Sequence, residues 1–177
     1  MRNIILSLTL SRIIFGPLIL ILMIFTSYGQ ICFVLFILAA LTDFFDGYLA
    51  RRYNHESRLG AILDPIGDKI LLVFSIITVI YISSDPFITT FSAIILGREF
   101  WVSALREYSS EINKSLQTSV SFLAKLKTTF QFISIAMFFF SFSYGSSMIQ
   151  FLATFVLFIA TLLSLKTGIE YTKNVFR

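Results

Sequence analysis

Four aspartates stand close together in "ALTDFFDGYLARRYNHESRLGAILDPIGDKILL" (residues 40–72), within a chain whose other long stretches are nearly all Leu, Ile, Phe and Val. They are Asp43, Asp46, Asp64 and Asp68. An ionised side chain at the centre of a membrane-spanning helix costs roughly 3 kcal/mol. Neighbouring carboxylates also repel one another unless a cation lies between them. These residues therefore predict a metal site.

The spacing of the aspartates places them on the faces of two successive helices. The first segment repeats at i, i+3, i+4 and i+7, which is one face of a helix with 3.6 residues per turn: Asp43, Asp46, Gly47 and Ala50. The second repeats at i, i+4, i+7 and i+8: Gly60, Asp64, Gly67 and Asp68. A polar turn at residues 53–57 joins the segments. We therefore expect both faces to border one cleft near the cytoplasmic end.

The chemistry of the carboxylates predicts the kind of metal. Ligation by oxygen alone, with no Cys or His on either face, is typical of a hard cation such as Mg²⁺ or Mn²⁺. Four carboxylates suit two ions, and a pair of ions clamps the attacking and leaving oxygens of a phosphoryl transfer. The small residues leave room for a bulky ligand. Arg51, one turn beyond Gly47, would meet its phosphate oxygens.

Two other interpretations of the aspartates stay open at this stage. One is a set of salt bridges to basic residues at the helix ends, namely Arg51, Arg52, Arg58 and Lys69. The other is a proton or cation pathway, which intramembrane carboxylates often mark.

The rest of the chain predicts the elements that position this site. With 177 residues, 56% hydrophobic, 21 Phe and only 14% charged, the chain is long enough for one domain (1–177) and too apolar for a water-soluble one. Apolar runs of spanning length recur at residues 8–28, 31–51, 60–82, 87–108, 124–142 and 148–165. The predicted fold class is an all-α integral membrane protein with six transmembrane helices.

Basic residues alternate between the predicted loops and so predict the orientation. Residues 26–30, 82–86 and 143–147 contain no Lys or Arg, whereas the basic residues lie on or near the opposite helix ends. By the positive-inside rule, both termini and the loops at 52–59 and 109–124 are cytoplasmic. The net charge of +4 is thus explained by basic residues that set the orientation of the helices and lie beside anionic lipid headgroups. No nucleic-acid partner is predicted.

The aspartate segment resembles the signature of the CDP-alcohol phosphotransferases, integral membrane enzymes of phospholipid synthesis. That signature is DxxDGxxAR, eight residues, then GxxxDxxxD, and this chain meets all eight fixed positions: Asp43, Asp46, Gly47, Ala50, Arg51, Gly60, Asp64 and Asp68. Further segments resemble the branch whose acceptor is glycerol 3-phosphate: "LTLSRI" (8–13), "LDPIGDKILL" (63–72), "GREFWVSALREYSSE" (97–111) and "KLKTTFQ" (125–131). That branch commonly has Pro-Asn where this chain has Ile5 and Leu6.

The resemblance implies a reaction and roles for the matched residues. The reaction is transfer of the phosphatidyl group from CDP-diacylglycerol to the 1-hydroxyl of sn-glycerol 3-phosphate, which releases CMP. Asp43, Asp46 and Asp64 would hold two metal ions with help from Asp68, the expected general base. The expected CDP-binding residues are Thr9, Asp43, Gly47, Ala50, Arg51 and Gly60. The resemblance also implies a bacterial-type inner membrane location and a homodimer.

The acceptor phosphate needs cations of its own. Arg98 and Arg106 lie eight residues apart in the fourth apolar run, and Lys125 and Lys127 open the fifth. Arg98 is the informative one, because it falls some ten residues inside a spanning run, where topology alone would not place it. Pairing of Arg98 with Asp68 or Glu99, and a purely topological role for the two lysines, stay open.

Two other functions remain as alternatives. One is an enzyme of the same family with inositol phosphate, serine or phosphatidylglycerol as acceptor. The other is a carboxylate-lined cation carrier. A carrier requires polar residues across the full membrane depth, whereas the outer halves of these helices, such as "LILILMIF" and "LLVFSIITVIYI", are almost wholly apolar. The sequence therefore disfavours the carrier.

Overall fold

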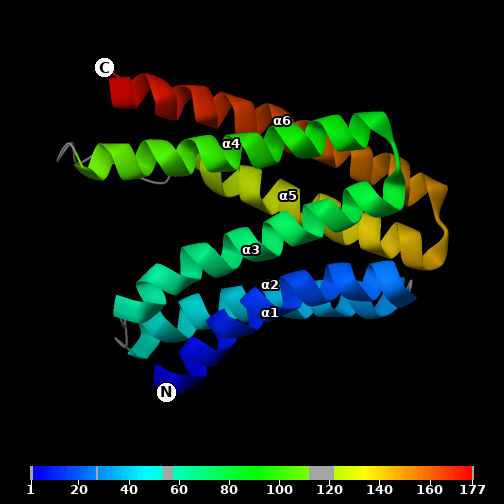
Figure 1. Ribbon diagram of the computed structural model, residues 1–177, viewed down its shortest axis with the longest axis horizontal. Coiled ribbons are helices and arrows are strands. Elements are labelled where there is room, and N and C mark those ends of the chain that lie inside the picture. The colour runs from blue at the N-terminus through cyan, green and yellow to red at the C-terminus, as the bar shows by residue number, and fades with distance from the viewer. Residues whose placement is uncertain (1, 27, 54–57, 112–121, 177) are drawn as a thin grey trace. The chain divides into compact units, whose positions relative to one another are not determined.

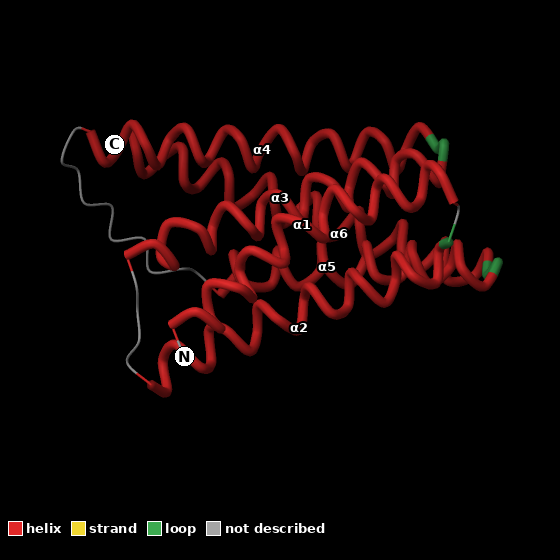
Figure 2. Tube along the Cα trace, turned by 60° about the horizontal axis from the view of Figure 1, so that its bottom comes forward, coloured by secondary structure: helices red, strands yellow, loops and turns green. Residues whose placement is uncertain are grey.

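The structure is a computed structural model of residues 1–177. It describes the backbone of residues 2–26, 28–53, 58–111 and 122–176, and the side chains of 10–26, 28–42, 62–111 and 122–176. These residues form six helices: α1 (Arg2–Thr26), α2 (Gly29–Tyr53), α3 (Arg58–Ser83), α4 (Pro86–Glu111), α5 (Phe122–Tyr144) and α6 (Ser147–Phe176). Figure 2 shows helix almost throughout the described chain, with short loops before α4 and α6. The predicted all-helical fold is confirmed.

Four of the helices are long and apolar enough to cross a membrane, namely α3 from Ile62, α4, α5 and α6. In α1 and α2 the apolar segments with described side chains, Leu10–Thr26 and Gly29–Thr42, are shorter. Large apolar side chains are exposed on several helices, including Ile14, Phe87 and Phe151. Such a surface is stable against lipid and not against water. The protein is therefore an integral membrane protein.

Helix boundaries follow from the capping residues in the predicted outer turns. At the start of α4, the Asp85 carboxylate accepts hydrogen bonds from the backbone N–H groups of Phe87 (2.8 Å) and Ile88 (3.0 Å). Pro86 then takes the first helical position, where its missing N–H costs nothing. Between α5 and α6, Gly145 adopts a left-handed φ of 64°, which glycine reaches without strain.

The chain divides into two compact units. Unit 1 comprises Met1–Ile82 and Ile135–Gln150, so it contains α1, α2, nearly all of α3, the end of α5 and the start of α6. Figure 1 shows α1 and α2 running side by side. Aromatic pairs join α2 to α5 in this unit: Phe36 with Phe139 (ring centroids 5.5 Å apart) and Phe33 with Phe140 (5.6 Å). Both pairs are edge-to-face, a geometry that aromatic rings favour.

Unit 2 comprises Ser83–Ser134 and Phe151–Arg177, and α4 lies along α6 in it (Figure 1). Phe91 and Phe158 pack at one end of this helix pair, and Tyr108 and Phe176 at the other. Between them, the indole N–H of Trp101 donates to the Thr172 hydroxyl (3.0 Å). α6 thus continues as a helix to Phe176, eleven residues past the predicted apolar run, because its polar end still packs on α4.

Candidate active site

The aspartates divide between two helices, as the spacing predicts. Asp43 and Asp46 lie in the second half of α2, which is helical without a break from Gly29 to Tyr53. Asp64 and Asp68 lie near the start of α3. The side chains of several predicted site residues lie outside the described residues, namely Thr9, Asp43, Asp46, Gly47, Ala50, Arg51 and Gly60. For these the structure gives the helix and no contact.

Asp64 and Asp68 are joined by an arginine of α1. One terminal nitrogen of Arg12 donates to Asp64 Oδ1 at 3.1 Å, and the other donates to Asp68 Oδ1. The Arg12 side chain is fully buried (0% exposed), whereas the two aspartate side chains are 44% and 46% exposed. The guanidinium therefore supports the carboxylates from inside unit 1 and leaves them accessible from outside.

Arg12 was missed as a site residue by the sequence reasoning, which treated it only as part of a matching segment. A signal was present, because Arg12 falls inside the first apolar run, as Arg98 does inside the fourth. A buried cation in an apolar segment calls for a carboxylate partner. The predicted salt-bridge partners for the aspartates were all on α2 or α3, so the partner from α1 is the new finding.

A second polar cluster lies in unit 2, around Glu99. The Glu99 carboxylate accepts hydrogen bonds from Arg98 Nη1 (3.1 Å) and from Lys127 Nζ, so one acid neutralises cations from α4 and α5. The three side chains are nearly buried, at 17% exposed for Glu99, 10% for Arg98 and 8% for Lys127. Of the two partners considered for Arg98, the structure shows Glu99.

Arg98 is held firmly by α6. Its Nε donates to the Ser164 carbonyl (3.1 Å) and its Nη2 to the Thr167 hydroxyl (3.0 Å). Gly168 packs so closely on the Arg98 side chain that an added Cβ would stand 3.0 Å from Arg98 Cγ. The guanidinium is thus fixed by contacts on several sides, which makes it a rigid positive group.

The other predicted acceptor cations are more accessible. Arg106 is exposed and its guanidinium carbon lies 5.7 Å from the centre of the Tyr171 ring, a cation–π contact. Its charge interacts with both Arg98 and Lys127. Lys125 is exposed on α5. The structure therefore brings Arg98 and Lys127 together on Glu99, with Arg106 further along the same helix as Arg98, and shows no such contact for Lys125 among the described residues.

Gln131 is a further polar residue that the sequence reasoning did not single out. It lies on α5 one turn after Lys127 and is 1% exposed. Neither its amide nitrogen nor its amide oxygen has a hydrogen-bond partner within the described part of the chain. A buried, unpaired amide is costly, so Gln131 lowers the stability of the fold.

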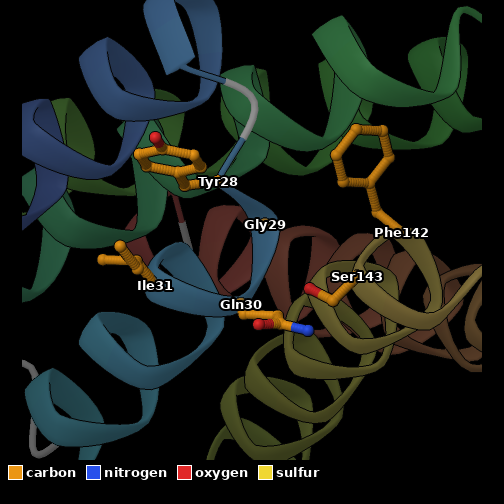
Figure 3. Close-up of a pocket in the computed structure, with 6 residues that line it drawn as sticks. All are labelled: Tyr28, Gly29, Gln30, Ile31, Phe142 and Ser143. Carbon is orange, nitrogen blue, oxygen red and sulfur yellow. The ribbon is translucent and has the colours of Figure 1, made fainter.

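A cavity of about 330 Å³ lies elsewhere in unit 1, where the turn between α1 and α2 meets the end of α5. Figure 3 shows the residues that line it: Tyr28, Gly29, Gln30, Ile31, Phe142 and Ser143. Gly29 starts α2, and Asp43 follows fourteen residues later, roughly 21 Å along the helix. This cavity therefore belongs to the opposite end of unit 1 from the aspartates.

The described side chains fit part of a metal site. No group of three or more His, Cys, Asp or Glu that would hold a metal occurs among them, and Asp43 and Asp46 fall outside that set. Asp64 and Asp68 offer carboxylate oxygens one helical turn apart, brought together by one guanidinium and open to solvent or ligand. Oxygen donors of this kind suit a hard divalent cation.

Comparison with known proteins gives the family. Residues 3–165 match the CDP-alcohol phosphatidyltransferase family. Three relatives bear the name CDP-diacylglycerol–glycerol-3-phosphate 3-phosphatidyltransferase. The protein of Wigglesworthia glossinidia brevipalpis is 43% identical over 130 residues, covering 72% of this chain and 71% of the relative. That of Salmonella choleraesuis (strain SC-B67) is 37% identical over 131 residues (73% and 72%). That of Shigella flexneri serotype 5b is 34% identical over 138 residues (78% and 74%). The chain therefore belongs to the CDP-alcohol phosphatidyltransferase family and is a transferase.

Proposed function

We propose that this enzyme transfers the phosphatidyl group from CDP-diacylglycerol to sn-glycerol 3-phosphate, giving phosphatidylglycerophosphate and CMP. The observation that carries the proposal is that relatives named for this reaction match the chain over about three-quarters of its length. The two-helix arrangement of the aspartates agrees with it. A lipid donor keeps its acyl chains in the bilayer while its diphosphate reaches carboxylates at the helix ends.

The donor site is assigned to α2 and α3. Members of this family generally use divalent metals, and we assign Asp43, Asp46, Asp64 and Asp68 as the ligands of Mg²⁺ or Mn²⁺, with two ions. When bound, such ions would neutralise the diphosphate and the leaving phosphate. Asp68 takes the proton of the attacking hydroxyl as general base. Since its carboxylate is already held by Arg12, it is oriented before the substrate arrives.

The remaining donor contacts are assigned by family resemblance. Thr9, Gly47, Ala50, Arg51 and Gly60 would border the cytidine and its phosphates. Glycine and alanine at these positions let the ligand approach a helix backbone closely. Arg51 supplies a planar guanidinium for the phosphate oxygens.

The acceptor phosphate is assigned to the cluster around Glu99. Arg98, Arg106 and Lys127 contribute three positive charges and Glu99 one negative charge, which leaves an excess of two. A phosphate monoester near neutral pH carries about the same charge of opposite sign. Lys125, which is exposed nearby in sequence, would guide the anion toward the cluster. Charge balance thus favours glycerol 3-phosphate, which carries a phosphate, over serine, which has no net charge near neutral pH.

The membrane arrangement follows the same proposal. All six helices cross the bilayer, including α1 and α2, and both termini and the aspartates face the cytoplasm of a bacterial-type inner membrane. Residues 1–177 form one domain, because α5 and α6 each contribute to both compact units. The enzyme is a homodimer, as family members commonly are.

The test is acceptor-dependent release of CMP by protein purified in detergent. CDP-diacylglycerol is supplied with glycerol 3-phosphate, inositol phosphate, serine or phosphatidylglycerol in separate reactions. We expect CMP release with glycerol 3-phosphate only, its loss in excess EDTA and its return with Mg²⁺ or Mn²⁺. Release of CMP with another acceptor would assign the enzyme to a different branch of the family. Full activity in excess EDTA would show that the reaction needs no divalent metal.

A further inference from the structure

Arg12 has an unusual place for an arginine. It lies in an apolar segment of α1, its side chain is 0% exposed, and it reaches two carboxylates of α3 that are four residues apart. A buried guanidinium is costly unless it is paired and hydrogen-bonded. Here its two terminal nitrogens each donate to a different aspartate. A single group on α1 thus sets the spacing between the Asp64 and Asp68 carboxylates.

From this geometry we propose that Arg12 is a positioning residue that holds Asp64 and Asp68 in the orientation required for metal binding and proton transfer. The inference rests on the proposed function, because it takes the two aspartates as metal ligands and Asp68 as the base. Arg12 itself touches neither substrate nor metal. It acts from the buried side of the carboxylates, while their accessible side, almost half of each side chain, faces the ligand.

A glycine on the same face of α1 fixes the position of Arg12 relative to α3. Gly16 lies one turn after Arg12 and is buried against α3, where an added Cβ would stand 3.1 Å from the Ile70 carbonyl oxygen and 3.3 Å from Leu71 Cα. Both neighbours are backbone atoms, so they cannot move aside as a flexible side chain would. The close approach of α1 to α3 at Gly16 therefore brings the Arg12 guanidinium within reach of both aspartates.

Position and charge predict opposite effects on metal affinity, which makes the proposal testable. A positive charge beside the carboxylates opposes a second cation, so its removal alone would tighten metal binding. If the arginine's main contribution is to orient the ligands, its removal weakens metal binding in spite of the lost repulsion. Groups that orient metal ligands typically change metal affinity or activity by about 10- to 100-fold when replaced.

The experiment measures Mn²⁺ binding to purified protein in detergent, by electron paramagnetic resonance of the free ion, in four variants. Arg12→Gln removes the charge, Arg12→Lys keeps it without the planar fork, and Gly16→Ala displaces α1 from α3 without altering any charge. Gly97→Ala is the matched control, because its added Cβ would have no atom within 4 Å apart from its chain neighbours and the adjacent backbone of its own helix. We expect the Mn²⁺ dissociation constant to rise about tenfold or more in the first three variants and to stay unchanged in the control.

Turnover provides a second readout on the same samples. Because Arg12 is assigned no substrate contact, kcat should fall at saturating metal while the KM values of both substrates change less than threefold. Arg12→Lys and Gly16→Ala keep the test valid if Arg12→Gln fails to fold. Unchanged or tighter Mn²⁺ binding in the folded variants overturns the role of Arg12. If wild-type protein binds no Mn²⁺, or Asp64→Asn leaves binding intact, the proposed metal site itself is wrong.

Discussion

Glu99 is the residue whose replacement tests the unit 2 cluster most directly. Its carboxylate is shared by Arg98 and Lys127, and all three side chains are at most 17% exposed. Glu99→Gln keeps the shape of the side chain and removes the charge. Two nearly buried cations would then lose their counter-charge, although the new amide oxygen still accepts one hydrogen bond.

The expected loss of stability follows from the burial. Breaking a buried ion pair by removing one partner costs about 3–5 kcal/mol, and the retained hydrogen bond favours the lower end, about 3 kcal/mol. For a protein of this size, 1 kcal/mol changes Tm by about 2–4 °C. We therefore expect Tm to fall by about 6–12 °C.

Glycerol 3-phosphate should restore part of this loss. Glu99→Gln raises the net charge of the cluster from +2 to +3, counted over residue 99 and the three cations Arg98, Arg106 and Lys127. Ligand at about one hundred times its dissociation constant stabilises a protein by about 2.7 kcal/mol. Binding that is tenfold tighter adds about 1.4 kcal/mol. The variant should therefore gain about 3 °C or more beyond the gain of the wild-type protein.

The chain offers one reporter in each unit. Cys32, the single cysteine, is fully buried in unit 1 and becomes available to a thiol-reactive dye on unfolding. Trp101, the single tryptophan, reports on unit 2 by fluorescence. An unchanged Tm by both reporters would refute the buried ion-pair reasoning. Equal stabilisation of variant and wild type by glycerol 3-phosphate would refute the assignment of this cluster to the acceptor phosphate.

Four further changes have defined outcomes. Arg106→Gln should raise the KM of glycerol 3-phosphate about ten- to a hundredfold, since a charge-assisted contact is worth about 1.5–3 kcal/mol, while equal effects on both substrates would contradict this. Asp64→Asn should abolish CMP release, as EDTA does, while the protein still folds, because Asp68 continues to pair with Arg12; an unfolded variant would show that the ion pair between Arg12 and Asp64 is essential to the fold. Gly168→Ala should lower Tm and raise the acceptor KM, because its Cβ meets Arg98 Cγ at 3.0 Å, and a silent variant would show that Arg98 is not held rigidly. Gln131→Met should raise Tm by about 2–12 °C, because it removes a buried amide that costs about 1–3 kcal/mol, whereas a fall would reveal a partner for the amide.

The helices were predictable because an apolar run of spanning length has few alternatives in a membrane protein. Each of the six predicted runs falls on one helix, apart from Tyr28, which ends the first run and lies beyond α1. The differences are at the ends: α1 begins at Arg2 and α6 ends at Phe176, both outside the predicted runs. Hydropathy detects the part of a helix that contacts lipid, whereas a helix continues as long as its backbone is bonded and its side chains pack. The polar end of α6 packs through Thr172 and Phe176.

The candidate site was predictable in its spacing and not in its pairing. Carboxylates at helical intervals can be read along one segment, so the assignment of the aspartates to α2 and α3 needed no tertiary information. The bridge from Arg12 to Asp64 and Asp68 spans more than fifty residues and depends on how closely α1 approaches α3 at Gly16. The sequence alone does not show how closely α1 and α3 approach each other.

The two lysines of α5 show why charge near a helix end is ambiguous until its burial is known. Lys125 and Lys127 are two residues apart, so they point to different sides of the helix and are equal by every criterion of topology. Lys125 is exposed, as a residue that only sets orientation would be. Lys127 is 8% exposed and bonded to Glu99, a cost that orientation alone does not require. Burial thus separates a charge that directs membrane insertion from one that belongs to a site, and it assigns Lys127 to the cluster around Glu99.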